Sequence, residues 1–311
     1  MTVSPGVRWV RLAVPGPLRH VNCWLIDDGD GVALVDTGMN TPDARAAWEA
    51  VFAGDTTGTR VTRVIGTHYH PDHIGLAGWI CARHDAPLLM TRAEWLYARM
   101  LIADARDVVP QEMVAHWRAA GWNVEQVAAG RTRGWSGFRR TVTPLPMGFT
   151  RLIDGQAIAI GGRDWRVVTG SGHSPDHACL LDEAAGVFIA GDQVLPRISP
   201  NVSVTISEPD ADPLGEWFAS IDKLRDLPAD LLVLPGHGDP FTGLHARLDA
   251  MAGEHRERLD TLPRSLPSRA ARSTPLRCCS AARSARTCLA WRPARRWRTC
   301  GGWKWKGVPL G

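Results

Sequence analysis

Thr67-His68-Tyr69-His70-Pro71-Asp72-His73 places three imidazoles and a carboxylate within six residues, directly after an apolar, strand-like run over residues 63–66. Imidazole and carboxylate groups are the usual nitrogen and oxygen ligands of zinc and related metals. A short loop that leaves a strand can direct such groups toward two neighbouring points. A polar surface loop is the alternative for an isolated His-x-His pair, but the longer His-x-His-x-Asp-His pattern favours a metal site.

Three further candidate ligands follow later in the chain, each close behind a short apolar run. His173 comes after residues 165–168, Asp192 after residues 187–190 and His237 after residues 231–234. We therefore expect each side chain at the C-terminal end of a buried strand, where a rigid sheet can hold chemistry. A lone histidine or aspartate is more often a core, surface or turn residue, but the whole set together indicates a metal site.

With Asp36 in Leu34-Val35-Asp36-Thr37-Gly38, this order of motifs resembles the metallo-β-lactamase superfamily over about residues 24–255. The resemblance implies an α/β fold, a four-layer αββα sandwich, with a two-metal site at one edge of the sheets. The implied ligands form two groups joined by a bridging carboxylate: His68, His70 and His173 in one, Asp72, His73 and His237 in the other, and Asp192 between them. Asp36 would orient ligands through hydrogen bonds, and an ordinary turn aspartate at a strand end is the alternative.

The chemistry implied by such a centre is hydrolysis. Two divalent cations, which we expect to be zinc with iron or manganese as alternatives, lower the pKa of a bound water and polarise a substrate oxygen. Asp72 can both bind a metal and accept a proton, so we assign it the catalytic acid/base role. No serine or cysteine nucleophile is needed, and Cys23, Cys81 and Cys179 lie in apolar stretches typical of core thiols.

The end of the chain differs sharply in composition from the rest. Residues 263–311 contain ten Arg and two Lys but no Asp or Glu. Their formal charge is therefore +12, and since the whole chain carries +4, residues 1–262 carry −8. One interpretation is an Arg-rich arm with interleaved Trp for nucleic acid. We favour a reading-frame shift near Leu262, because translating the end of the gene in another frame gives a sequence that resembles the end of a small winged-helix-like C-terminal module. We therefore expect a catalytic domain over residues 1–262 and a tail without a native fold over residues 263–311.

The residues eliminate substrates better than they select one. Acyl-homoserine lactonases have a tyrosine shortly after the bridging aspartate, but no tyrosine follows Asp192 in this chain. Flavodiiron proteins have a glutamate where this chain has His70, and true β-lactamases lack an aspartate at the position of Asp72. The glutathione-binding region of glyoxalase II is not visible either. Residues 172–177 and 235–238 resemble the β-lactamase-like protein 2 group, which implies a small ester or thioester, or single-stranded RNA. The charge of residues 1–262 disfavours RNA, so we expect a small carbonyl substrate; an inactive metal-binding protein with a disrupted C-terminus is the third alternative.

Residues 91–150 separate the second and third motifs and predict a helical insertion. Thr91-Arg92-Ala93-Glu94 has capping-box spacing, which predicts a helix from there, and residues 111–120 predict a second one. The insertion either covers the site and shapes substrate choice or packs as a helical pair without a role in recognition. Arg197, Asn201 and Ser203 are candidate substrate contacts by position alone.

Other elements follow from shorter patterns. Residues 7–14, 22–26 and 32–36 predict strands, with a hairpin turn over residues 27–31. A helix is predicted over residues 42–52, with Thr41 as its N-cap and Gly54 at its end. The absence of a long apolar run, a signal-peptide pattern or a regular cysteine framework predicts a cytoplasmic protein without a membrane partner. A homodimer is left open.

Overall fold

The computed structural model describes residues 1–54 and 59–261, and every structural statement below refers to these residues. The predicted basic tail over residues 263–311 and the proposed frame shift lie outside the described residues. Within the described part, no helix is both long enough and apolar enough to cross a membrane.

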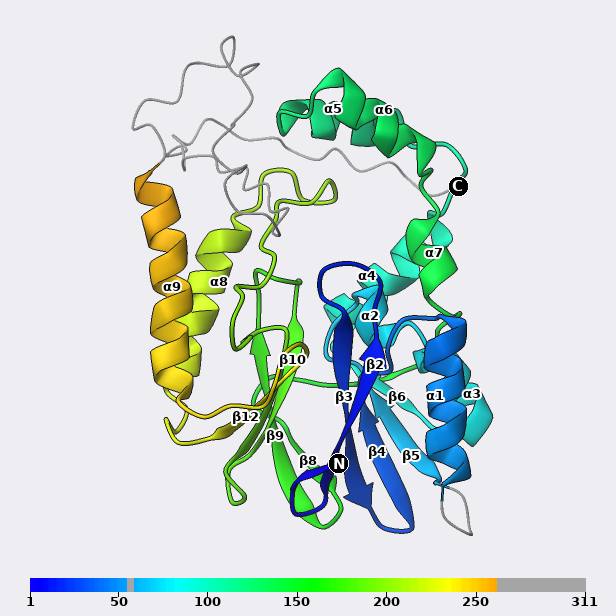
Figure 1. The fold of residues 1–311 in the computed structure, drawn as a ribbon, viewed down its shortest axis with the longest axis vertical. Coiled ribbons are helices and arrows are strands. Elements are labelled where there is room, and N and C mark those ends of the chain that lie inside the picture. The colour runs from blue at the N-terminus through cyan, green and yellow to red at the C-terminus, as the bar shows by residue number, and fades with distance from the viewer. Residues whose placement is uncertain (55–58, 262–311) are drawn as a thin grey trace, which may run out of the picture.

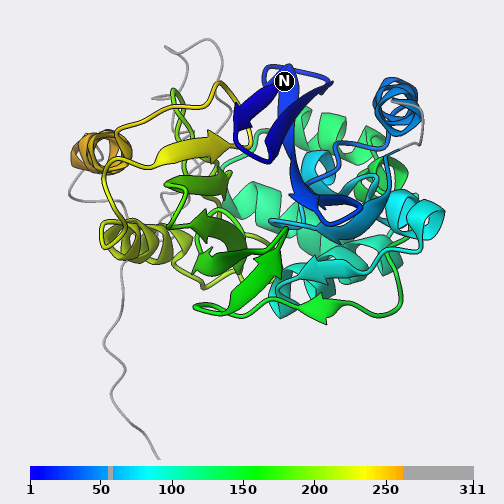
Figure 2. The same cartoon turned by 90° about the horizontal axis from the view of Figure 1, so that it is seen from below.

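Two β-sheets pack face to face, and helices cover the outer face of each (Figures 1 and 2). The first sheet has the strand order β1-β2-β3-β4-β5-β6-β7 and the second has the order β12-β11-β10-β9-β8. Helices α1 (Pro42–Ala53) and α3 (Ala77–His84) lie on the first sheet, and α8 (Pro213–Leu224) and α9 (Leu244–Asp260) lie on the second. This arrangement confirms the predicted four-layer αββα sandwich.

The strands of the two sheets are two to nine residues long. The first sheet contains β1 (Thr2–Ser4), β2 (Val7–Ala13), β3 (His20–Asp28), β4 (Gly31–Val35), β5 (Val61–Ile65), β6 (Leu88–Met90) and β7 (Thr150–Arg151). The second contains β8 (Ala157–Ile160), β9 (Arg163–Gly170), β10 (His177–Asp182), β11 (Val187–Gly191) and β12 (Leu232–Pro235). From β4 to β7 the neighbours are parallel, as are β11 and β12, whereas β9, β10 and β11 are antiparallel.

Alternating side chains divide the core into three apolar layers. Along β4, Leu34 packs toward the helices of the first sheet, while Val35 packs between the two sheets. Trp48 of α1 is fully buried in the first layer and Trp217 of α8 is fully buried in the layer outside the second sheet. Because both faces of the central strands are covered, they read as continuous apolar runs.

The helix predicted over residues 42–52 is confirmed as α1. The Thr41 hydroxyl accepts a hydrogen bond from the Ala44 backbone N–H at 3.2 Å, and the helix ends at Gly54. The side-chain cap and Pro42 at the first helical position satisfy or remove backbone donors that the first turn leaves free.

The insertion contains α4 (Arg92–Ala103), α5 (Gln111–Ala119), α6 (Val124–Thr132) and α7 (Gly137–Thr141), and it lies across one end of the sandwich (Figure 1). The capping box predicted at Thr91 and Glu94 is wrong, because the Thr91 side chain makes no capping bond. A capping box does occur at α6, where Asn123 and Gln126 exchange hydrogen bonds of 2.8 and 2.9 Å.

Candidate metal centre

The predicted ligands lie on loops that leave the sheets at one end of the sandwich. Asp36 follows β4, the His68 loop follows β5, and His173, Asp192 and His237 follow β9, β11 and β12. Parallel neighbours such as β4 and β5, or β11 and β12, end at the same edge, so their loops converge there. A hydrogen bond of 2.8 Å from the Ala178 backbone N–H to the Thr67 carbonyl ties the two sheets together beside the site.

All seven predicted metal ligands come together in two adjoining groups. In each group, one potential ligand atom per residue lies within 4.8 Å of the others. The first group is His68, His70, His173 and Asp192, and the second is Asp72, His73 and His237. Asp72 and His73 belong to the short helix α2 (Pro71–Ile74), which continues the His68 loop.

The carboxylate of Asp192 lies between the two groups. Its Oδ2 is 3.6 Å from His173 Nε2 and 3.4 Å from His237 Nε2, and its Oδ1 is 3.4 Å from His73 Nε2. Asp72 Oδ2 lies 3.3 Å from His237 Nε2. A carboxylate in this position can contact cations in both groups at once.

Backbone and carboxylate acceptors orient three of the histidine rings. His173 Nδ1 lies 2.7 Å from the Asn201 carbonyl and His237 Nδ1 lies 2.6 Å from the His20 carbonyl. A carbonyl only accepts, so each Nδ1 donates, and Nε2 is the ring atom that faces the centre. His73 Nδ1 lies 2.7 Å from Asp36 Oδ2, which favours the same tautomer.

Asp36 also anchors the start of the loop that carries the histidines. Its carboxylate accepts from the Thr67 backbone N–H at 2.9 Å and from the Thr67 hydroxyl at 2.8 Å. The backbone of Asp36 is left-handed, with φ 59°, a conformation that aspartate adopts more readily than most residues. Asp36 therefore does more than form a turn: it contacts both His73 and the strand end that delivers His68.

Electrostatics at the centre favour positive charge between the carboxylates. Burial opposes ionisation of Asp72, yet His73 and His237 lower its pKa to about 2. Burial likewise opposes protonation of His237, but Asp192 raises its pKa to about 10. In the other group, burial lowers the pKa of His70 to about 3, so this ring is a neutral donor.

The donor set fits a pair of divalent ions. Among the described residues, His73 Nε2, His237 Nε2 and Asp192 Oδ1 are buried and form no hydrogen bond. Their closest contacts with one another and with Asp72 are 3.3–3.4 Å long and lack hydrogen-bond geometry. Buried polar atoms are nearly always paired, and a cation between these atoms would supply the missing partner. Imidazole nitrogens and carboxylate oxygens are ligands of zinc, iron and manganese.

Glu94, which sequence reasoning treated only as a helix cap, is part of the scaffold of the site. It is fully buried, and its carboxylate accepts from Tyr69 N–H at 2.8 Å, the Ser174 hydroxyl at 2.7 Å and Asp176 N–H at 2.7 Å. Helix α4 thus holds the loops of His70 and His173 together. Burial raises the pKa of Glu94 to about 7, while each of the three hydrogen bonds lowers it.

Two other buried polar residues support the site. Asn22, in β3, donates to the Pro235 and Gly238 carbonyls at 2.8 and 2.7 Å and so clamps the loop of His237. His177 accepts from the Asp192 backbone N–H at 3.1 Å and stacks on His68 with ring centroids 4.8 Å apart. A polar residue inside an otherwise apolar strand was the signal that could have identified Asn22.

The three residues proposed as substrate contacts have different surroundings. Asn201 contributes its carbonyl to His173, while its side chain accepts from the Ser203 hydroxyl at 2.9 Å. Asn201 thus acts on the site through its backbone. The structure gives Arg197 no hydrogen bond or ion pair within the described residues, and nothing places it or Ser203 against a substrate.

Comparison with known proteins agrees with this geometry. A family model described as the metallo-beta-lactamase superfamily matches residues 16–237. A solved structure of a beta-lactamase domain protein from Burkholderia ambifaria is 39% identical, with a TM-score of 0.73, covering 84% of this chain and 77% of that one. The probable metallo-hydrolase YqjP of Bacillus subtilis is 24% identical over 83% of this chain and 79% of its own length.

A further relative is named for an activity. The acyl-coenzyme A thioesterase MBLAC2 of Gallus gallus is 25% identical over 77% of this chain and 80% of its own length. The family match covers well over half of the chain, and the Burkholderia structure is similar to it in both sequence and fold. The chain belongs to the metallo-β-lactamase superfamily.

Proposed function

We propose that this protein is a metal-dependent hydrolase that cleaves a small ester or thioester. In this proposal His68, His70 and His173 hold one divalent ion, Asp72, His73 and His237 hold the other, and Asp192 bridges them. Zinc is the metal we expect, with iron or manganese as alternatives. We also propose that residues 1–262 form the catalytic unit.

One observation carries the proposal: Asp192 lies within 3.6 Å of ligand nitrogens from both groups, while buried donor atoms around it lack partners. Such an arrangement stabilises the folded protein poorly without cations, because unpaired buried polar atoms cost free energy. It is well suited to holding two charges close together. Family membership supports the same conclusion, since homologues are named metallo-hydrolase and thioesterase.

The ions, when bound, supply Lewis acidity, which activates water and polarises a substrate carbonyl. The residues of the chain do the remaining work. His73, His173 and His237 are held in one tautomer by their Nδ1 partners, so their Nε2 atoms need no rearrangement. Asp72 is more exposed than Asp192, with 13% against 9% of its side chain accessible, and in this proposal it accepts and returns a proton at Oδ2.

For a thioester the reaction balances without any further reagent. The oxygen of water forms a bond to the carbonyl carbon, the carbon–sulfur bond breaks, and the thiolate leaves with one of the water's protons. The products are a carboxylate and a thiol: Asp72 passes one of the water's protons to the sulfur, and the second proton is released to solvent. The thioester preference within the proposal rests on the name of the Gallus gallus relative, and an ester would follow the same course.

The direct test is turnover by metal-loaded protein. Purified protein reconstituted with zinc should hydrolyse acetyl and butyryl thioesters of N-acetylcysteamine, followed by thiol release. Asp192→Ala should abolish turnover, because it removes the carboxylate that lies between the two groups. The matched control is Asp249→Ala, an exposed aspartate of α9, which should keep wild-type rates.

Two other results would change the assignment. Cleavage of single-stranded RNA without thioester hydrolysis would replace the substrate class. Full metal occupancy without turnover of thioesters, lactones or RNA would favour an inactive metal-binding protein. Unchanged turnover by Asp192→Ala would refute the two-metal arrangement itself.

A further inference from the structure

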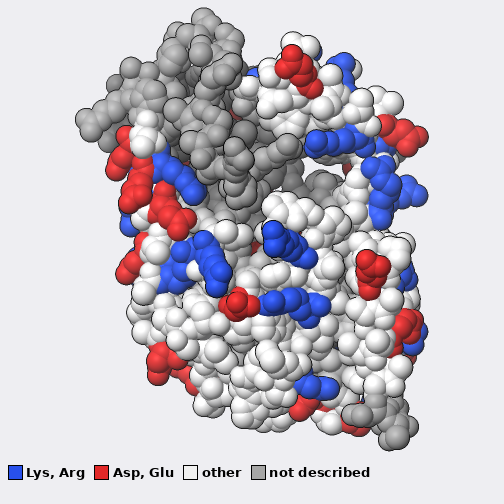
Figure 3. Space-filling model, in the orientation of Figure 1, with Lys and Arg blue, Asp and Glu red and all other residues white. Residues whose placement is uncertain are grey.

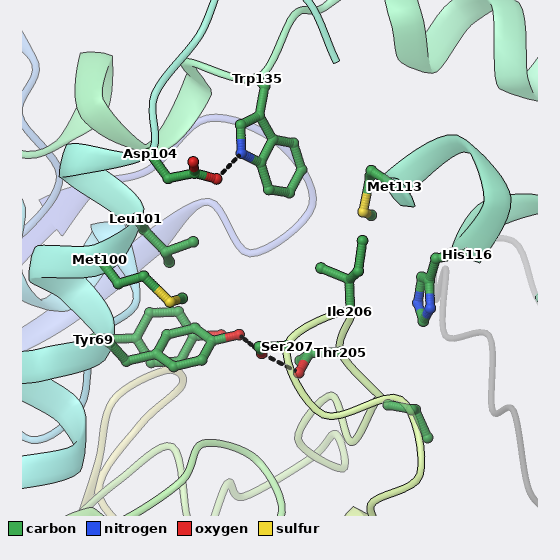
Figure 4. Close-up of a pocket in the computed structure, with 12 residues that line it drawn as sticks. Tyr69, Met100, Leu101, Asp104, Met113, His116, Trp135, Thr205, Ile206 and Ser207 are labelled. Carbon is green, nitrogen blue, oxygen red and sulfur yellow. Dashed lines mark hydrogen bonds between the residues drawn. The ribbon is translucent and has the colours of Figure 1, made fainter. Parts of the chain in front are cut away.

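A cavity of about 460 Å³ lies between the insertion and the loop that follows Asp192. Its volume falls in the range of small-molecule sites, about 300–1,000 Å³. Figure 4 shows the side chains around it: Met100 and Leu101 from α4, Met113 from α5, and Ile206 from the opposite loop. The surface that these side chains offer is predominantly hydrocarbon and thioether.

Several polar groups in the cavity wall form hydrogen bonds with one another. The Tyr97 and Thr205 hydroxyls each lie 2.8 Å from Ser207 Oγ. The indole N–H of Trp135 donates to Asp104 Oδ2 at 2.9 Å (Figure 4). A polar ligand would find these groups already engaged, whereas an alkyl chain loses nothing by contacting them.

Two parts of the cavity wall are connected to residues of the metal centre. Tyr69, which lines it, stands between His68 and His70 in the chain, and its ring centroid is 4.5 Å from that of His70. On the other side, the wall over residues 204–207 follows Asn201, whose carbonyl orients His173. The cavity wall thus includes a residue in contact with His70.

We propose that this cavity binds the acyl chain of the substrate, so that the enzyme prefers thioesters or esters of unbranched hydrophobic acids over acetyl groups. The inference rests on the proposed hydrolase function and adds the substrate class. Leu101 and Ile206, which reach the cavity from opposite walls, set the length of chain accepted. Burial of successive methylenes supplies the selectivity.

Basic residues are frequent in the segment around Trp135, which lines the cavity. Arg131, Arg133, Arg139 and Arg140 are exposed and flank Trp135 in the chain, and basic side chains gather near α6 and α7 in Figure 3. Biological thiol carriers are polar and often anionic, whereas the side chains that line the cavity are predominantly apolar. The acyl chain is thus the part that enters.

The test compares two series of thioesters with zinc-loaded protein. In the first, N-acetylcysteamine carries acetyl, butyryl, hexanoyl or octanoyl groups; in the second, acetyl is joined to alkanethiols of two to eight carbons. We expect kcat/KM to rise roughly fourfold per methylene in the acyl series until the cavity is full. The alkanethiol series should stay flat. A flat acyl series, or a rise confined to the thiol series, would overturn the inference.

Variants that fill the cavity provide the second readout. Leu101→Trp should lower the hexanoyl-to-acetyl ratio of kcat/KM at least tenfold, and Ile206→Trp should do the same from the opposite wall if the first variant fails to fold. Leu96→Trp is the matched control: Leu96 lies on the same helix, is 53% exposed and does not line the cavity. An equal loss for every chain length in both cavity variants would contradict an acyl pocket.

Binding separates failure of the inference from failure of the proposed function. Affinities of acetate, butyrate, hexanoate and octanoate for zinc-loaded protein can be measured by isothermal titration calorimetry without any turnover. A roughly fourfold tightening per methylene, lost in Leu101→Trp, would support the pocket even if no thioester were hydrolysed, and only the hydrolase proposal would then fall. Affinity independent of chain length would overturn the pocket even in an active hydrolase.

Discussion

Replacing Asp36 by asparagine tests how the scaffold holds the metal centre. Asn keeps the shape of the side chain and tolerates the left-handed backbone at this position. Its amide nitrogen cannot accept, so one of the donors on Thr67 or His73 loses its buried partner. One such loss costs about 1–3 kcal/mol, which should appear as a lower free energy of unfolding of metal-free protein in urea.

The same change should weaken one metal site. If the amide nitrogen faces His73 Nδ1, it favours the tautomer with the proton on Nε2, the atom that lies 3.4 Å from Asp192. Loss of a partner that orients a ligand typically costs 10–100-fold in metal affinity, and chelator competition should detect a loss of about this size for one of the two ions.

A matched variant is available for this experiment. Asp85 is also left-handed, with φ 50°, but it is exposed at the end of α3. Asp85→Asn should change stability by no more than about 0.5 kcal/mol and leave zinc affinity unaltered. Asp36→Asn protein with wild-type stability and wild-type affinity for both ions would refute the reasoning.

Three further predictions concern other parts of the centre. Gly236→Ala should abolish binding of the ion held by Asp72, His73 and His237, as measured by calorimetry. A Cβ at this position would overlap Asp192 Oδ1 and approach His73 Cε1 to 2.8 Å. The control is Gly253→Ala in α9, which has open space around it and should leave the free energy of unfolding in urea unchanged or raise it by up to ~1 kcal/mol. The folded-state pKa of Glu94, about 7, lies above its ordinary value of 4.5, so its stabilising contribution is fully present below pH 4.5 and is lost as the pH rises through 7. The stability of wild type should therefore fall relative to Glu94→Gln by about 3 kcal/mol across that window, and parallel pH profiles of the two proteins would exclude this titration. Chelation of the metals should lower the thermal midpoint, since an ion at 1,000 times its Kd adds about 4 kcal/mol; an unchanged midpoint after verified metal removal would contradict tight binding.

The ligand set could be predicted from the sequence because each ligand follows an apolar run that forms a strand. His173 comes after β9, Asp192 after β11 and His237 after β12, and parallel pairing places strand ends at a common edge. These residues are metal-ligand types, so their position and chemistry indicate the same site. The αββα architecture was predicted from the resemblance of these motifs to the metallo-β-lactamase superfamily.

Residues that act through long-range contacts could not be identified in this way. Glu94 has the spacing of a capping box with Thr91, but its carboxylate binds Tyr69 and Ser174, 25 and 80 residues away along the chain. Such partners depend on how α4 packs across two loops, which local pattern does not record. Tertiary contacts here override a local signal.

In the insertion, by contrast, helix α6 was not predicted although a local signal for it was present. Helix α6 was missed because Val127 is its one buried large apolar residue and Val124 at its start is 85% exposed, so no apolar periodicity marks it. The spacing of Asn123 and Gln126 was a local signal that could have found it. The cavity beside Tyr69 could not be foreseen, because its walls come from segments about 100 residues apart in sequence.

The most direct test of the account is the number of metal ions that one chain binds. Metal-free protein titrated with zinc in a calorimeter should bind two equivalents, and Asp192→Ala should lose tight binding at both sites because that carboxylate faces both groups of ligands. Elemental analysis of the isolated complex should give the same ratio of two. Binding of a single ion or none by folded protein, or two ions held equally well without the Asp192 carboxylate, would contradict the proposed centre.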